Sequence, residues 1–308
     1  MSQLCVTLFG KMSIAYQDDV ITGNASGKAQ ELFSYLLLHR NRTHSRERLA
    51  SLLWGDYCTT TQSKKYLRKA LWQLQTALAS LPVFAKTGLL ETKPEWIKLN
   101  EIDTLNLDVA TFERAYEMAS GISGKELQKS HVKRIEKAIE SYRGELLESW
   151  YYDWCLVERE RLQDMYIRLL YKLLEYAEAN KLVEKGIGYG SEILKFDVAH
   201  EQTYRALMRI YHQSGDRTSA IRQYNRCVQV LEEELGISPE AETRNLFLQL
   251  KSGNSLSYNQ SEPASGQNMD LMVNQFKQLQ ENLMLIQQQV ENTMQQVEQK
   301  LTTWAETS

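Results

Sequence analysis

The sequence predicts a mainly α-helical protein that starts with a small β-sheet and ends in a coiled coil. Three observations predict this fold class. Apolar residues recur at helical spacing through most of the 308 residues, short alternating segments bounded by Gly or Pro occur near the N-terminus, and a seven-residue repeat follows residue 268. Because 43% of the residues are hydrophobic and only 24% are charged, the chain can bury sizeable cores.

The first region, residues 1–104, begins with two predicted strands, 5–9 and 13–16, which flank a turn. Two amphipathic helices follow, at 28–39 and 46–54. The residues expected to face inward are Leu32, Phe33, Leu36 and Leu37 in the first of these helices and Leu49, Leu52 and Leu53 in the second.

A third helix is predicted over residues 61–81, and a hairpin follows it. The inward row of the helix is Leu67, Leu71, Leu74 and Leu78. The hairpin strands, 89–92 and 96–99, flank Lys93-Pro94-Glu95, a turn in which proline presets the backbone. Strands, three helices and a final hairpin, in this order, predict a winged helix-turn-helix, with mainly basic residues on the outer face of the third helix.

Charge is distributed unevenly. The whole chain has a formal net charge of −3, whereas residues 28–72 contain nine basic and three acidic residues. Clustered positive charge attracts DNA phosphates, although a basic helix face is often only a solvated surface. The winged-helix order favours the DNA interpretation, with the third helix in the major groove and the hairpin on the backbone. The predicted DNA contacts are Lys64, Lys65, Arg68, Lys69, Trp72, Arg46, Arg48 and Lys93.

Residues 105–251 are predicted to be almost entirely helical and weakly repetitive. At an offset of 34 residues, Leu173, Ala177, Gly186 and Gly190 align with Leu207, Tyr211, Ala220 and Tyr224. This alternation of small and large residues is typical of stacked tetratricopeptide-like helical hairpins. The aromatic run 150–154 is interpreted as a set of helix-packing anchors rather than a ligand platform.

The C-terminal part is predicted to contain a flexible linker, 252–268, and a coiled coil, 269–304. An amphipathic helix leaves its apolar seam in water unless a partner covers it, so we expect a homodimer or a higher homo-oligomer. The seam could instead bind another protein. The residues expected in the seam are Phe276, Leu279, Leu283, Ile286, Val290 and Val297.

Several function classes are disfavoured. The sequence has neither a signal peptide nor the roughly 18 consecutive apolar residues of a membrane helix, so we expect a cytoplasmic location and no membrane partner. Its four cysteines are widely spaced and form no metal motif. Residues 23–28 lack the spacing of a phosphate-binding loop. With no catalytic constellation, we expect no enzyme activity, no cofactor and no metal.

Several short motifs occur along the chain in a fixed order. They are Leu8-Phe9-Gly10, Lys28 to Leu32, Ser45 to Leu49, Leu67 to Leu71, Tyr142 to Leu147, Trp154, Glu158-Arg159, Gly215 to Arg217, and Glu234 to Pro239. In combination, these motifs resemble the Streptomyces antibiotic regulatory protein family, in which a winged helix precedes a bacterial transcriptional activator domain. The resemblance covers most of the chain. It implies a transcriptional activator that binds repeated elements in double-stranded promoter DNA and recruits RNA polymerase.

Two departures from the family pattern stand out. Leu74-Gln75 occupies a position that often carries a second Leu-Arg pair, and the C-terminal coiled coil is unusual in short members. The coiled coil also supports an alternative function, a protein-interaction scaffold that uses the helical repeat and the tail. In that case the winged helix would have a structural or protein-binding role.

Overall fold

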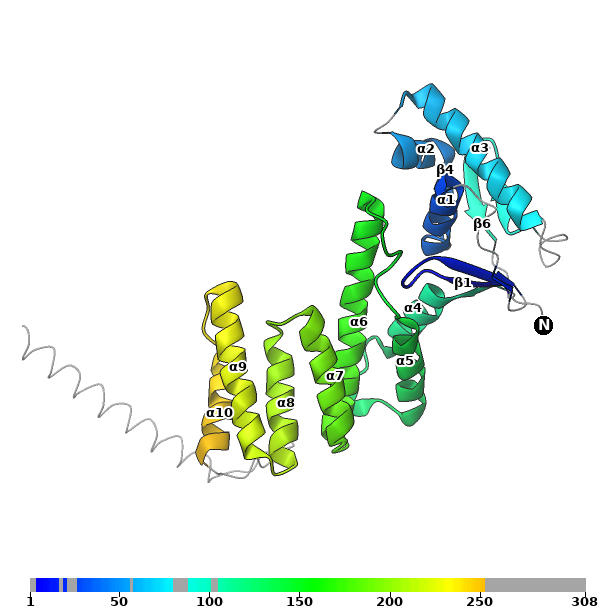
Figure 1. Cartoon of the computed structure of the whole chain (residues 1–308). Helices are drawn as coiled ribbons and strands as arrows, with labels where there is room; N and C mark the ends of the chain where they lie inside the picture. The colour runs from blue at the N-terminus through cyan, green and yellow to red at the C-terminus, as the bar shows by residue number, and fades with distance from the viewer. Residues whose placement is uncertain are drawn as a thin grey trace, which may run out of the picture. The chain divides into compact units, whose positions relative to one another are not determined.

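The computed structural model describes residues 4–16, 19–20, 27–55, 58–79, 88–100 and 105–252, and Figure 1 shows their arrangement. The chain begins with a four-stranded sheet in the order β3-β2-β1-β7. Strand β1 pairs antiparallel with β2 and parallel with β7, so a segment following the wing returns to the N-terminus. This return was not predicted, because three residues are too few to show an alternating pattern. The strands are β1 (Leu4–Thr7), β2 (Ser13–Tyr16), β3 (Asp19–Val20) and β7 (Leu105–Leu107).

The winged helix-turn-helix is confirmed. Its three helices lie beside a second sheet, in the order β4-β6-β5, whose last two strands form the wing hairpin. The core beneath the helices contains Phe33, Leu36, Leu67 and Ile97, each at most 1% exposed. The elements are α1 (Gly27–Leu38), β4 (His44–Ser45), α2 (Arg46–Trp54), α3 (Thr60–Ala79), β5 (Leu90–Thr92) and β6 (Trp96–Leu99).

Helix α2 begins as its sequence predicts but turns a different face inward. The Ser45 hydroxyl accepts the backbone N–H of Arg48 at 3.4 Å, which satisfies one of the free donors at the helix start. Leu52 was predicted to face inward, and this was wrong, because its side chain is 42% exposed. The buried stripe includes Ala50 and Trp54 beside the predicted leucines, and this rotates Leu52 towards solvent.

Helix α3 buries its four predicted leucines together with Ser63 and Ala70. The leucine spacing of four, three and four residues keeps the row on one side of the helix, which has 3.6 residues per turn. The opposite side of the helix therefore carries mainly exposed side chains.

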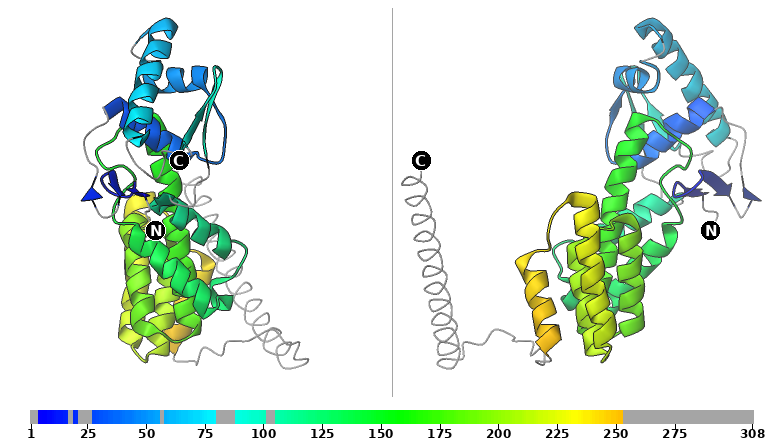
Figure 2. Two further views of the ribbon diagram at one scale, coloured as in Figure 1. Left: turned by 90° about the vertical axis from the view of Figure 1, so that its right-hand side faces the viewer. Right: turned by 60° about the vertical axis from the view of Figure 1, so that its left-hand side comes forward.

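The rest of the described chain is a series of packed helices, which confirms the tetratricopeptide-like architecture. Successive helices α6 to α10 pack against their neighbours in sequence, and the 27-residue helix α6 also extends towards the winged helix (Figures 1 and 2). The elements are α4 (Asp108–Ala119), η2 (Gly124–Glu126), α5 (Lys129–Ser141), α6 (Asp153–Ala179), α7 (Val183–Phe196), α8 (Glu201–Gln213), α9 (Arg217–Leu235) and α10 (Ala241–Ser252).

Glycines in α7 allow α8 to approach closely. A Cβ atom on Gly186 would lie 2.6 Å from Ile210 Cδ1, and one on Gly190 would lie 2.7 Å from Leu207 Cδ2. Both partner side chains are at most 2% exposed, so they cannot move away into solvent. The small residues in the predicted repeat are therefore explained by helix-to-helix distance.

Alanine substitutions at two nearby glycines of α7 should have opposite effects. We expect Gly190→Ala to lower the free energy of unfolding by about 1–2 kcal/mol, because overpacking outweighs the gain in helix propensity. Gly188→Ala is the matched control: its Cβ would meet nothing within 4 Å, so stability should rise by about 0.5–1 kcal/mol. Urea unfolding of both variants measures the two effects. Equal effects would contradict the close packing of α7 against α8.

The linker after residue 252 and the coiled coil at 269–304, including the whole predicted seam, lie outside the described residues. No helix among the residues that the structure covers has the length and apolar character needed to cross a membrane.

Candidate nucleic-acid interface

A groove between α2, α3 and the wing brings three of the predicted contact residues together. Arg46 from α2 and Lys64 and Arg68 from α3 line it, with Pro94 and Glu95 at the tip of the hairpin. Two consecutive helices and the wing thus form one concave surface, which carries three basic side chains together with the acidic Glu47 and Glu95.

The outward side of α3 presents further predicted contacts. Lys65 and Lys69 are exposed, and Trp72 is 66% exposed. Within the described part of the chain, neither lysine nor Arg68 forms an ion pair or a side-chain hydrogen bond. Their charges are therefore available to an external anion.

Lys64 differs from these residues because it is already paired. Its Nζ lies 2.7 Å from Glu47 Oε1 in the first turn of α2. The lysine holds the pKa of the Glu47 carboxyl below its ordinary value, mainly through this hydrogen bond. Lys64 was predicted from the sequence, whereas Glu47, whose carboxylate lies in the same groove, was not.

Arg46 and Gln75 fix the position of the wing. The Arg46 guanidinium donates to the carbonyl of Lys93 at 3.2 Å, and its backbone N–H donates to the carbonyl of Glu95 at 3.0 Å. The Gln75 side-chain amide donates to Thr92 Oγ1 at 3.3 Å. Gln75, which stands where an arginine is frequent, thus connects α3 to the hairpin. Arg46 has a structural role in addition to any contact with DNA.

The other predicted residues lie on separate surfaces. Arg48 lines a different pocket, together with Arg42 and His44. Lys69 lies beside Tyr66 in a pocket on the other flank of α3. Lys93 at the wing tip is 3.6 Å from Glu91, so part of its charge is compensated. The groove therefore contains a subset of the predicted contacts.

Backbone contacts join the first sheet to the helical region. The Asp108 carboxylate, at the start of α4, accepts the backbone N–H groups of Leu8 and Phe9 at 2.8 and 2.9 Å. Burial raises the pKa of Asp108, while these hydrogen bonds act in the opposite direction. The carbonyl of Leu8 also accepts the N–H of Leu147. The strand end is thereby held between α4 and the segment that precedes α6.

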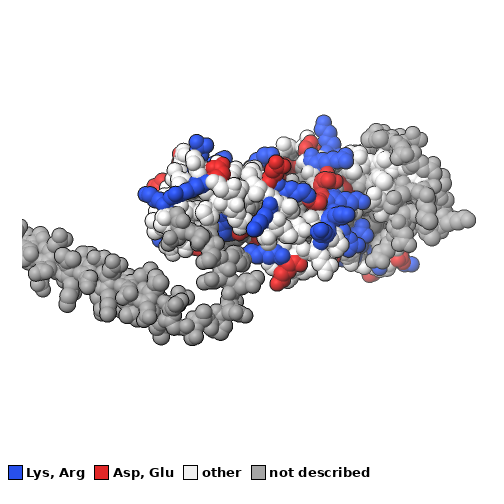
Figure 3. Space-filling view, turned by 90° about the horizontal axis from the view of Figure 1, so that it is seen from below, with Lys and Arg blue, Asp and Glu red and all other residues white. Residues whose placement is uncertain are grey.

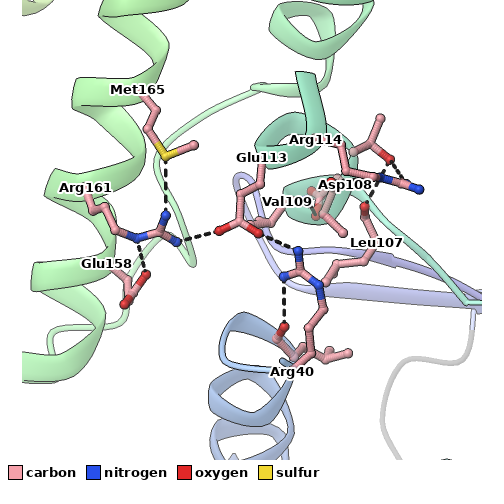
Figure 4. Close-up of polar contacts among 12 residues, drawn as sticks. Arg40, Leu107, Asp108, Val109, Glu113, Arg114, Glu158, Arg161 and Met165 are labelled. Atoms are coloured by element: carbon pink, nitrogen blue, oxygen red, sulfur yellow. Dashed lines mark hydrogen bonds and ion pairs between the residues drawn. The ribbon is translucent and has the colours of Figure 1, made fainter. Parts of the chain in front are cut away.

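A charged cluster connects α1 with α4 and α6 (Figure 4). The Glu113 carboxylate on α4 is 2.5 Å from an Arg40 guanidinium nitrogen and 2.7 Å from one of Arg161. Arg161 on α6 also contacts Glu158 at 2.8 Å. Because the Glu113 side chain is only 14% exposed, these two arginines are the main polar partners of its carboxylate. Paired charges thus help to hold the C-terminal end of α1 against the helical region.

An aromatic contact reinforces this junction. Trp154 is 9% exposed, and its indole N–H donates to the buried carboxylate of Glu31 on α1 at 3.4 Å. His39, next to Glu158, has its pKa lowered to about 4, mainly by burial, and is therefore neutral at pH 7. Trp154 is an anchor as predicted, whereas Tyr151 in the same run is 77% exposed. Sequence spacing gave no signal for the Glu31 partnership, because 123 positions separate it from Trp154.

Positive charge is not confined to the winged helix. In Figure 3, which views the molecule from below, Lys and Arg side chains also gather on the surface, with acidic side chains among them. The basic side chains of the groove differ from these in their setting: they lie on a helix pair beside a hairpin, the order of elements found in winged-helix modules. No group of acidic, cysteine and histidine side chains suited to a metal ion occurs among the residues described.

Comparison with known proteins agrees with this architecture. Residues 107–251 match the family model of the bacterial transcriptional activator domain. The chain therefore contains this domain, and it is similar to transcription regulators of the Streptomyces antibiotic regulatory protein type. The regulator thus combines a winged helix with an activator domain of packed helix pairs. Its relatives regulate transcription, and it is not an enzyme.

Named relatives of this regulator are mycobacterial. It is 21% and 22% identical to the transcriptional regulatory protein MoaR1 of Mycobacterium bovis and of Mycobacterium tuberculosis, over 71% of this chain and 70% of each relative. Its fold matches the structure of Mycobacterium tuberculosis EmbR in complex with a low-affinity phosphopeptide, with a TM-score of 0.64 and 16% identity. That match covers 82% of this chain and 66% of the EmbR chain, just under two thirds of its length.

Proposed function

We propose that this regulator binds double-stranded DNA in a sequence-specific manner, with α3 in the major groove and the β5–β6 hairpin on the phosphate backbone. The observation that carries the proposal is the row of unpaired cations, Lys65, Arg68 and Lys69, on the unpacked side of α3. Phosphate attraction requires free positive charge, and base recognition requires a helix that can enter the groove. Residues 1–104 would form the DNA-binding domain, and residues 105–251 the activator domain.

The roles of the predicted contacts differ within this proposal. Arg68 lies in the groove and can form two hydrogen bonds with guanine, whereas Lys65 and Lys69 suit phosphates. Trp72, Arg48 and Lys93 are assigned to flanking contacts. Recruitment of RNA polymerase is assigned to the activator domain, which the Glu113 cluster holds against α1. Activation of transcription is therefore the proposed outcome of promoter binding.

Selection from DNA of random sequence tests the proposal and does not require the operator to be known. The full chain should enrich particular duplexes, and its affinity for them should fall steeply as salt increases, because bound counterions are released. A scaffold that uses only protein contacts would enrich no duplex and would show no such salt dependence. Failure to enrich any sequence would reject specific DNA binding.

We further propose that the regulator is a homodimer or higher homo-oligomer assembled through the heptad residues between 269 and 304. Truncation after Ser252, where α10 ends, should convert the oligomer to a monomer in light scattering. DNA affinity should fall together with the loss of the second binding site. An unchanged mass would show that the C-terminal segment is not the assembly device.

A further inference from the structure

Glu47 is an unexpected residue on a surface proposed to meet DNA. Its side chain is 70% exposed and lies in the groove with Arg46, Lys64 and Arg68. A carboxylate there faces an array of phosphates that repels it. An acidic residue in the first turn of a helix is favoured by the helix dipole, but that effect does not require a partner on α3.

The pairing of Glu47 with Lys64 contributes little to folding. Lys64 is 49% exposed, and ion pairs in contact with solvent add little to stability because water and salt screen them. The pair joins the first turn of α2 to the second turn of α3, the two helices of the DNA-reading unit. Its effect is therefore expected in binding rather than in stability.

We infer that Glu47 sets DNA-sequence specificity by holding Lys64 until a G·C base pair in the major groove engages both side chains. Guanine offers the N7 and O6 acceptors to the ammonium, and the N4 amino group of cytosine donates to a carboxylate. A phosphate offers nothing to Glu47 and meets a lysine whose charge is compensated. This inference rests on the proposed DNA binding.

Removal of the carboxylate charge should therefore affect specific and non-specific binding unequally. In Glu47→Gln, Lys64 is free to attract any phosphate, so affinity for unrelated DNA should rise. The slope of log affinity against log salt should steepen by about 0.9 for the one additional charge. Affinity for the selected sequence should rise less or fall, because the neutral amide oxygen of Gln accepts a hydrogen bond from cytosine more weakly than the carboxylate does.

The experiment uses a duplex that the wild-type full chain selects from random DNA and a scrambled duplex of equal length and composition. We expect Glu47→Gln to lower the ratio of the two affinities about tenfold, within the range for one base-reading pair. Selection with this variant should also lose its preference for G·C at one position. Glu95→Gln is the matched control: Glu95 lies in the same groove without a paired lysine, so the ratio should not change.

Each outcome decides the inference. Equal gains by Glu47→Gln on both duplexes would mean that the carboxylate acts only as a repelling charge, and would overturn the inference. An unchanged ratio, or a loss of preference in Glu95→Gln as well, would also overturn it. If the wild-type chain selects no duplex, the proposed DNA binding itself fails. If the wild-type chain selects a duplex and Glu47→Gln keeps the same affinity ratio, only the role inferred for Glu47 fails. Because Glu47 is exposed, the variant should unfold at the wild-type urea concentration.

Discussion

Arg68→Ala should reduce affinity for the selected DNA by roughly 5- to 150-fold, the consequence of losing one base-reading contact of about 1–3 kcal/mol. The guanidinium lies in the groove between α2, α3 and the wing, and no acidic residue described in the structure pairs with it. An unpaired guanidinium can donate two parallel hydrogen bonds to guanine, whereas the other guanidinium of the groove, that of Arg46, already donates to the carbonyl of Lys93. Titration of labelled duplex by fluorescence anisotropy measures the loss.

Two further variants separate recognition from attraction. Lys65→Ala should weaken binding to selected and scrambled DNA alike and should reduce the salt slope by about 0.9, because it removes a phosphate contact. Arg226→Ala, on an exposed position of α9, removes the same charge as Arg68→Ala and should change neither affinity. If Arg226→Ala bound DNA as weakly as Arg68→Ala, binding would depend on net charge rather than on α3.

Glu113→Ala should lower the free energy of unfolding by about 2–3 kcal/mol. Removal of one partner from a buried ion pair costs about 3–5 kcal/mol, and this value is reduced here because Arg161 is 40% exposed and water screens it. The substitution would leave Arg40 and Arg161 close together without their shared counter-charge. Urea unfolding followed by tryptophan fluorescence gives the free energy, and Trp154 at the junction provides a local signal.

The same variant tests whether the junction couples the two domains. We expect hydrogen exchange to accelerate in α1 and at the start of α6, because Glu113 is the counter-charge shared by Arg40, just after α1, and Arg161 on α6. Glu117→Ala is the matched control: it lies one turn further along α4 and is exposed, and the structure records no ion pair for it. A cost of the same size in Glu117→Ala would mean that α4 is sensitive to any substitution, and the clustered charges would have no special role.

Local sequence patterns were sufficient where one element determines the feature. The leucine row of α3 predicted both its buried face and its free face, because a helix with 3.6 residues per turn separates the two by spacing alone. The hairpin at Pro94 was equally local, since turn geometry involves residues close in sequence. The glycines of α7 likewise made the 34-residue repeat visible in the sequence, because their spacing along one helix is a local property.

Features that involve two distant elements were decided by tertiary structure. The inward face of α2 was misjudged at Leu52 because its orientation depends on how Trp54 packs, which periodicity does not specify. Three contacts between distant elements had no sequence signal, because each pair of residues meets only when the helices and strands pack together. These contacts join Gln75 to the wing, Glu113 to two arginines, and Glu31 to Trp154.

The sequence by itself determined that this regulator has a winged helix with a basic third helix, since hydrophobic spacing and charge distribution are properties of the chain. Only the tertiary structure decided which cations are free to bind. Glu47, from another helix, neutralises Lys64, whereas Lys65, Arg68 and Lys69 project from the unpacked side of α3 without partners among the described residues. Charge compensation acts over a few ångströms in space, and sequence separation does not report that distance.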